Sequence, residues 1–473
     1  MLELPKNNVE RITLLNELLD GTSNRNGLGN NRDNWDAVSL FDSAEKNEIE
    51  EFIKLLQRAA SDTLNSTNLQ EISSLMRNIS GQIKFGNEFE VKDWVETSQT
   101  LISKCDSNHR WRLEYGAEWY HDAINSVCGN ATHSAVTVIL INPDIVTDEV
   151  KENFRNFIAM RIQVHIEVSE LSHAEPIIAT LGRNAIWLDR EFPNWLQMDV
   201  FASLNEYRME TSRAFWQGFL VSRKWDMPFL RTSSLEKHII ELLSNLQDAG
   251  KSYDSYLGRD SSEAFIYLLV ELFLRTPNDT QLHFFSNEFI TLQVNTDLFL
   301  KWLDYISWSM HKIDFGNYPE LSDNIYECRI KPLLNNLNPN LITPQTVGML
   351  AELLGSLRKY FPQALADWRL LGKNIGCQFS QNSRILMWLT NGANSQYLVD
   401  NFPDDLIRFI QSYLKGFTRD GQVSDWELSE FIMAHGRHLL ASSPDALSKL
   451  SSTLNRIDFR HTLSNWPTSL KGT

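Results

Sequence analysis

The chain has 473 residues, of which 42% are hydrophobic and 22% are charged, and its formal net charge at pH 7 is −16. This composition predicts a folded protein of two or three domains and excludes disordered and fibrous chains. The acidic excess disfavours binding to nucleic acid through overall charge, because a phosphate backbone would be repelled. The sequence shows no secretory leader and no apolar run of about 18 residues, so we expect a cytoplasmic protein that does not associate with membranes.

Residues 1–95 are predicted to form an N-terminal helical region. Apolar residues recur at a spacing of three to four in 9–19, 46–60 and 64–83, which is typical of amphipathic helices. The segment 21–34 is rich in Gly and Asn and predicts a loop. Its glycines match neither the dinucleotide-binding motif nor the P-loop, so this loop is not expected to bind phosphate.

Residues 96–230 are predicted to form a small α/β domain. A helix over 110–127 precedes three short apolar stretches, AVTVILIN at 135–142, QVHIEV at 163–168 and AIWLD at 185–189. These stretches predict strands, and the intervals between them are long enough for helices. We therefore expect a parallel βαβαβ sheet, covered by helices on both faces, inside a mainly α-helical protein.

The first candidate site lies at the end of the second predicted strand. Open α/β sheets bind ligands at the carboxyl ends of their strands, and His165, Glu167, Glu170, His173 and Glu175 fall at or near that end. Imidazole and carboxylate groups can hold a divalent metal or act as a general acid and base. Their spacing matches no established metal motif, so an acidic loop with a nearby histidine is the simpler interpretation.

The same edge of the predicted sheet also holds Asp144 and Asp189, which follow or end the other two strands. Together with Glu167, Glu170 and His173, they would form the site of a metal-dependent hydrolase or nuclease. The motifs HExxH, GxSxG and Walker A and the protein-kinase motifs are all absent from the sequence. No metal site and no cofactor is therefore predicted.

Two further groups of ionisable residues lie on predicted helices, where they fit solvated helix faces better than catalytic sites. In the second group, Glu427 and His438 are three helical turns apart, too far to share one ligand. The first group is His109, Arg110, Arg112, Glu114, Glu118, His121 and Asp122, and the second is Asp425, Glu427, Glu430, His435 and His438.

A basic segment follows the predicted α/β domain and offers a candidate nucleic-acid site. Basic side chains interleaved with aromatic ones can contact phosphates and stack on bases. The alternative is that the charges are solvated and flank a buried aromatic helix. The basic residues are Arg208, Arg213, Arg223, Lys224 and Arg231, and the aromatic residues between them are Trp216, Phe219 and Trp225.

The four cysteines are predicted to be free and mostly buried thiols. Cys105, Cys128, Cys328 and Cys377 are far apart and form no CxxC pair. Neither a disulfide framework nor a zinc ribbon is therefore expected.

Residues 231–473 are predicted to be entirely helical, as a bundle or an α-solenoid. Prolines stand at the boundaries of the amphipathic segments, which suits packed helix pairs, although no fixed repeat recurs. The predicted helices span 199–220, 234–249, 262–274, 296–311, 346–360, 403–414, 424–440 and 444–454.

The stretch 116–168 resembles the opening of phospholipase-D-like domains, in which an amphipathic helix precedes an apolar strand and a further helix leads to a second strand. The active residues of that family form HxKxxxxD, whereas this chain contains no HxK. The resemblance implies a degenerate, non-hydrolytic domain attached to a helical region. It also implies a place among the accessory proteins of bacterial multi-gene systems, including anti-phage defence.

Three functions follow as hypotheses. The first is a non-catalytic interaction, sensor or scaffold subunit of a larger bacterial assembly, with other protein subunits as partners. The second is a metal-dependent hydrolase or nuclease acting through Glu167, Glu170 and His173. The third is an accessory factor that binds nucleic acid through the basic segment between Arg208 and Arg231 or through a partner.

Overall fold

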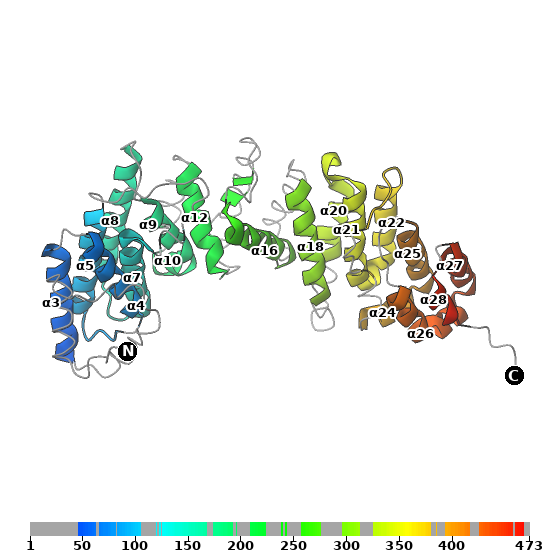
Figure 1. Cartoon of the computed structure of the whole chain (residues 1–473), viewed down its shortest axis with the longest axis horizontal. Coiled ribbons are helices and arrows are strands. Elements are labelled where there is room, and N and C mark those ends of the chain that lie inside the picture. Colours follow the sequence, from blue (N-terminus) through cyan, green and yellow to red (C-terminus); the bar gives the residue numbers. More distant parts are fainter. Residues whose placement is uncertain are drawn as a thin grey trace. The chain divides into compact units, whose positions relative to one another are not determined.

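The structure of the protein is a computed structural model, in which none of the described residues lies in a strand (Figure 1). The chain divides into two compact units, residues 1–235 with 253–265, and residues 236–252 with 266–473. The residues described are 46–62, 66–81, 83–105, 120, 123, 125–167, 174–192, 195, 209–223, 238–239, 242–243, 257–275, 296–312, 325–379, 385, 393–416, 425–456 and 459–467.

In the first unit, each helix packs mainly on helices that are close to it in the sequence: α4 and α5 on α7, α3 on α5, and α9 on α7 and α12. The helices are α3 (Lys46–Asp62), α4 (Ser66–Ile79), α5 (Glu88–Lys104), α7 (Val127–Ile141), α8 (Asp148–Glu167), α9 (Ala174–Arg183), α10 (Ala185–Glu191) and α12 (Met209–Ser222). The helix α16 (Arg259–Arg275) contains the division between the units.

The predicted α/β domain is wrong, and α7 shows why. The expected strand at 135–142 is the second half of this helix, which begins after Ser126, whose hydroxyl accepts a hydrogen bond from the backbone N–H of Gly129 at 3.0 Å. Neighbouring helices bury α7 almost all round. Within residues 135–141 only Thr137 is polar, so no helical period is visible there, and this apolar run cannot be told from a buried strand.

The other two expected strands are helical as well. Residues 163–167 continue α8, in which no Gly, Pro or Asn follows Met160 to end the helix, and Val168, the last residue of the expected strand, lies outside the described residues. Residues 185–189 lie in α10, which follows α9 after Asn184. The predicted parallel βαβαβ sheet is therefore replaced by consecutive helices.

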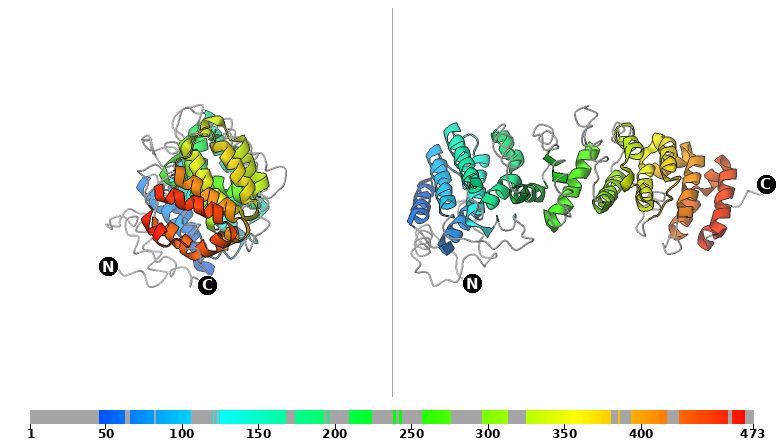
Figure 2. Two further views of the ribbon diagram at one scale, coloured as in Figure 1. Left: turned by 90° about the vertical axis from the view of Figure 1, so that its right-hand side faces the viewer. Right: turned by 90° about the horizontal axis from the view of Figure 1, so that it is seen from above.

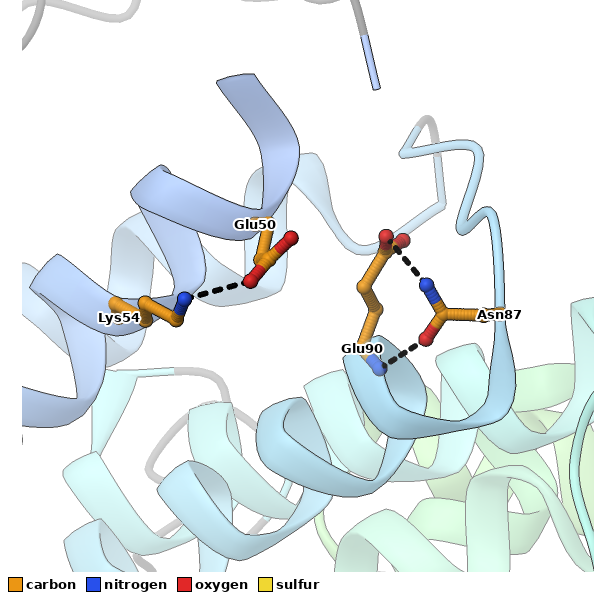
Figure 3. Close-up of polar contacts among 4 residues, drawn as sticks. All are labelled: Glu50, Lys54, Asn87 and Glu90. Carbon is orange, nitrogen blue, oxygen red and sulfur yellow. Dashed lines mark hydrogen bonds and ion pairs between the residues drawn. The ribbon is translucent and has the colours of Figure 1, made fainter. Parts of the chain in front are cut away.

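The start of α5 carries a reciprocal cap that the sequence encodes locally. The side chain of Asn87 accepts a hydrogen bond from the backbone N–H of Glu90 at 3.0 Å, and its amide donates to the Glu90 carboxylate at 2.9 Å. Figure 3 shows this pair beside the exposed i, i+4 pair of Glu50 and Lys54 on α3, the helix that packs on α5. The Glu90 carboxylate also accepts from the backbone N–H of Gly86, so the buried charge is well satisfied.

The contact between α9 and α12 depends on two glycines. A Cβ atom added to Gly218 of α12 would lie 1.8 Å from the carbonyl oxygen of Ala179, and one added to Gly182 of α9 would lie 2.3 Å from that of Phe215. Each helix thus presents a glycine to the backbone of the other. The two helices approach closely, and Phe215 and Phe219 are fully buried beside this contact.

In the second unit, helices stack on their near neighbours in the sequence: α18 on α21, α21 on α22, α22 on α25, α25 on α27, and α26 on α28. Figure 2 shows α25 to α27 next to one another in the orange-to-red part of the chain. The elements are α18 (Thr296–Lys312), the π-helix η6 (Tyr326–Ile330), α20 (Lys331–Asn336), the 3-10 helices η7 (Pro339–Leu341) and η8 (Gly355–Tyr360), α21 (Pro344–Leu354), α22 (Phe361–Gly372), α24 (Ala393–Asn401), α25 (Pro403–Gly416), α26 (Asp425–Ser442), α27 (Pro444–Arg456) and α28 (Arg460–Ser464).

The described part of the C-terminal half is helical, as predicted, and its helices make most of their contacts with near neighbours in the sequence. Two side chains tie the stack together. The buried Arg329 donates to the backbone carbonyl of Phe273 at 3.2 Å, near the end of α16. The indole of Trp368 on α22 donates to the backbone carbonyl of Val347 on α21 at 2.7 Å.

The boundary expected at 95/96 falls inside α5, and the one at 230/231 falls close to the end of the first segment of unit 1.

Cys105 and Cys128 are joined as a disulfide between the end of α5 and the start of α7, which corrects the expectation of four free thiols. Cys328 and Cys377 are free and partly buried. None of the described helices is long and apolar enough to cross a membrane.

Candidate functional site

The first unit gathers polar side chains from several helices at one half-buried place, and this group is the candidate site. We define the arginine–histidine cluster as Arg77 of α4, Asn130 and His133 of α7, Arg183 of α9, and Tyr120, which precedes α7 in the chain. Asn130 is buried, whereas the other four side chains keep part of their surface exposed. A half-buried cluster of ionisable groups is where altered proton affinities and ligand sites are most often found.

The local sequence explains why these residues come together. Arg77 and Arg183 each lie in the last turn of their helix, where the carbonyl ends of the backbone attract a positive charge. Asn130, His133 and Thr137 have a spacing of three and then four, so they share one stripe along α7. Because α7 packs on both α4 and α9, this polar stripe lies beside both arginines.

Hydrogen bonds connect the cluster across the helices. A guanidinium nitrogen (Nη1) of Arg77 donates to the Asn130 side-chain oxygen at 3.1 Å, and the Asn130 amide donates to the hydroxyl of Ser74 at 3.2 Å. Arg183 donates to the hydroxyl of Tyr120, and its guanidinium carbon lies 5.3 Å from the centroid of that ring. Side chains from distant parts of the chain thus fix the positions of both guanidinium groups.

The environment holds His133 in its neutral form at neutral pH. Burial lowers the pKa of His133 to about 4, and the positive charges of Arg183 and Arg77 add to this effect. Burial also lowers the pKa of Arg77, although an arginine stays charged at neutral pH. At pH 7 the cluster therefore presents two guanidinium charges beside a neutral imidazole, with the Tyr120 hydroxyl and the Asn130 amide as further polar groups.

The residues of the predicted strand-end site are placed differently from the expectation. His165 and Glu167 lie in the last turns of α8, and Glu175 is buried in the first turn of α9. Glu170 and His173 lie outside the described residues. The edge of a sheet that was expected to collect these side chains does not exist here, because the segments around it are helices.

The two aspartates expected at the same edge lie in a turn and on a helix. Asp144 is exposed in the turn between α7 and α8, and Asp189 is half-buried on α10, where burial raises its pKa. In the described part of the chain, no three His, Cys, Asp or Glu residues are placed so that they could hold a metal ion together.

The basic segment is only partly described. Arg213 lies on α12, and Arg223 follows that helix with its guanidinium 3.8 Å from the Glu263 carboxylate. Trp216 and Phe219 are buried in the core, so their faces are covered and cannot stack on nucleic-acid bases. Arg208, Lys224, Trp225 and Arg231 lie outside the described residues.

The two helical groups of ionisable residues also have a place in the structure. All seven residues of the first group, between His109 and Asp122, lie outside the described residues. The second group lies on α26, where His438 is 3.8 Å from Asp400 of α24 and Glu430 accepts a hydrogen bond from the Trp426 indole at 2.9 Å. Burial lowers the pKa of His435. These are local contacts of a helix surface.

Sequence reasoning missed Arg77, Asn130, His133 and Arg183. A signal was present, because Asn130, His133 and Thr137 are polar residues at helical spacing within an apolar stretch. Such spacing indicates a helix with one polar stripe. No local pattern indicated that the stripe would meet two arginines located more than 45 residues away on either side.

No family model, no curated protein and no solved structure matches this chain. The resemblance of 116–168 to phospholipase-D-like domains therefore stays a prediction that these comparisons leave untested.

Proposed function

We propose that this protein is a non-catalytic interaction subunit that binds a partner protein through its stacked helices. The observation that supports this proposal most directly is the packing of the second unit, in which each helix contacts its sequence neighbours. Helices stacked in this way leave long surfaces open to partners, and proteins with this packing commonly act through such surfaces. The setting in a bacterial defence assembly is part of the same proposal and rests only on the sequence resemblance.

The exposed face of α26 is the surface with the best chemistry for a partner. Trp426 and Met433, two turns apart on this helix, are 58% and 55% exposed. Tryptophan and methionine are enriched in protein interfaces and scarce on other surfaces. The hydrogen bond from the Trp426 indole to the exposed Glu430 holds the ring beside a negative charge.

The charge of the chain indicates what kind of partner fits. Sixty acidic residues against 44 basic ones give the chain its net charge of −16. Complementary charge speeds association and selects between partners, so a protein with a basic surface is favoured. We therefore propose a basic partner protein that covers Trp426, Glu430 and Met433.

The test is to purify the tagged full-length chain from its native cells and to measure the mass of its complexes by size-exclusion chromatography with light scattering. We expect a partner at a fixed ratio, with binding that weakens as salt rises. The double substitution Trp426→Ala with Met433→Ala should release the partner, because it removes the apolar centre of the face. Leu370→Ala is the matched control, since Leu370 is 70% exposed on a different helix of the same unit.

A chain that remains a monomer without any partner at a fixed ratio would contradict the proposed function. A partner that is released equally by Leu370→Ala and by the α26 substitutions would contradict the assignment of the face. The hydrolase and nucleic-acid hypotheses stay predictions, because several of their residues lie outside the described part of the chain.

A further inference from the structure

We propose that the arginine–histidine cluster of the first unit is a binding site for the phosphate group of a small molecule. The proposal is independent of the partner proposed for α26, because the cluster lies in the first unit and α26 in the second.

The donor groups are those that proteins use for phosphate. Arginine presents several N–H donors in a planar fork that matches phosphate oxygens, and such charge-assisted hydrogen bonds are about twice as strong as neutral ones. Arg77 and Arg183 come from α4 and α9, and both lie beside the polar stripe of α7. Two arginines that reach one place from two helices can grip one tetrahedral group from two directions.

The degree of burial suits a site for a small anion. Arg77, Arg183 and His133 are each only partly exposed, so the charges act in a medium that screens them less than water does. Each of these side chains also keeps some surface exposed to solvent. Asn130 is buried and holds Arg77 through a hydrogen bond at 3.1 Å, so this guanidinium is oriented before any ligand binds.

The charge of the cluster favours a phosphate dianion over a carboxylate. Two guanidinium groups match two negative charges, and a phosphate offers more acceptor oxygens than a carboxylate does. His133 adds a specific signature. Its pKa is lowered in part by Arg183 and Arg77, so a bound dianion that offsets these charges should raise that pKa. Among the described residues, the charges that act on it are those of Arg183 from α9 and Arg77 from α4, and the Tyr120 hydroxyl lies beside these two arginines.

A simpler role for the two arginines is to neutralise the carbonyl ends of α4 and α9, where both side chains lie. In that case the arginines would stabilise the helices and bind no ligand. The two roles predict different results when phosphate is added, because only a binding site would take up phosphate.

The test is isothermal titration of the full-length chain with inorganic phosphate, O-phosphoserine and AMP, at about pH 7.5 where histidine is ordinarily neutral. Sodium chloride of equal ionic strength and sodium acetate are the reference anions. We expect saturable binding of the phosphate compounds and none of acetate. Tighter binding of AMP or O-phosphoserine than of free phosphate would identify an organic phosphate as the ligand.

Variants link the binding to the cluster. Arg183→Gln should weaken phosphate binding by about tenfold or more, because it removes a charge-assisted contact. Arg183→Lys keeps the charge and should retain part of the affinity. Arg190→Gln is the matched control, because Arg190 belongs to the same unit but lies over Trp187 on α10, with its guanidinium carbon 5.0 Å from the centroid of the Trp187 ring.

The histidine signature provides a second, independent readout. Histidine labelled with ¹⁵N should show one imidazole whose pKa rises when phosphate is added, and His133→Gln should remove that signal. Circular dichroism checks that each variant is folded, and the Arg183→Lys variant covers the case in which Arg183→Gln is not. The proposal is overturned if phosphate binds no better than chloride. It is also overturned if Arg183→Gln, or Arg183→Lys where Arg183→Gln does not fold, binds phosphate as tightly as the control Arg190→Gln does.

Discussion

The substitution Gly218→Ala tests the close contact between α9 and α12. A Cβ atom at this position would lie 1.8 Å from the carbonyl oxygen of Ala179, 2.7 Å from its carbonyl carbon and 3.0 Å from its Cα. Ordinary contact begins at 3.4 Å, so the oxygen lies about 1.6 Å too near. All three atoms belong to the backbone of α9 and cannot rotate away. The two helices would therefore have to move apart.

Moving α9 and α12 apart would lower the free energy of unfolding, because it would expose buried apolar side chains. The face of α12 at this contact includes Phe215, Trp216 and Phe219, each at most 2% exposed. Overpacking a core costs about 1–3 kcal/mol when side chains can adjust, and a clash between backbones leaves less room to adjust. Alanine gains back only about 0.5–1 kcal/mol over glycine within a helix. We therefore expect a net loss of about 3 kcal/mol in the free energy of unfolding.

Urea unfolding of the full-length chain, with hydrogen exchange followed by mass spectrometry, measures this loss and locates it in α9 and α12. Exchange is needed because a protein of two units need not unfold in a single step. Gly81→Ala is the control, since its Cβ would meet only the Thr137 side chain, at 3.9 Å. The reasoning is refuted if Gly218→Ala is as stable as Gly81→Ala and α9 and α12 exchange no faster.

Three further predictions concern named side chains. The pKa of His133 is about 4 in the folded chain and its ordinary value is 6.5, so the unfolded chain binds a proton more readily between these pH values. The contribution of neutral His133 to the free energy of unfolding is therefore complete above pH 6.5 and is lost as the pH falls towards 4. Urea unfolding at a series of pH values should show a loss of about 3 kcal/mol over this window that His133→Gln removes, and an unchanged profile in that variant would contradict the assignment. Trp94→Phe should lower the free energy of unfolding by about 1–3 kcal/mol, measured with urea, because it removes the 2.8 Å hydrogen bond from the buried indole to the Ser134 hydroxyl and leaves a cavity. An unchanged free energy of unfolding would show that this hydrogen bond is not formed. Arg358 has a φ of 42°, which glycine adopts freely and alanine does not. Both Arg358→Gly and Arg358→Ala lose the hydrogen bond to Asn394, so Arg358→Gly should be more stable than Arg358→Ala by about 1 kcal/mol in thermal unfolding. Equal stabilities would argue against the left-handed backbone at this residue.

The sequence by itself determined the helices that have one exposed face. The segments predicted at 46–60, 296–311, 403–414 and 444–454 are α3, α18, α25 and α27, with ends within two residues of those expected. Their period is visible because water contacts one side of each helix and the core contacts the other. Prolines at the first positions of α21, α25 and α27 also marked helix starts correctly, since proline there removes no needed hydrogen bond.

Tertiary structure alone decided the state of α7 and the membership of the arginine–histidine cluster. The second half of α7 is rich in β-branched residues, which lowers helix propensity only slightly, so burial among α4, α5 and α9 could outweigh it. Arg77 and Arg183 are more than 100 residues apart, and no local pattern relates them. The two arginines come together because α4 and α9 both pack on α7. This packing depends on contacts between distant segments, which the spacing of residues within one segment cannot predict.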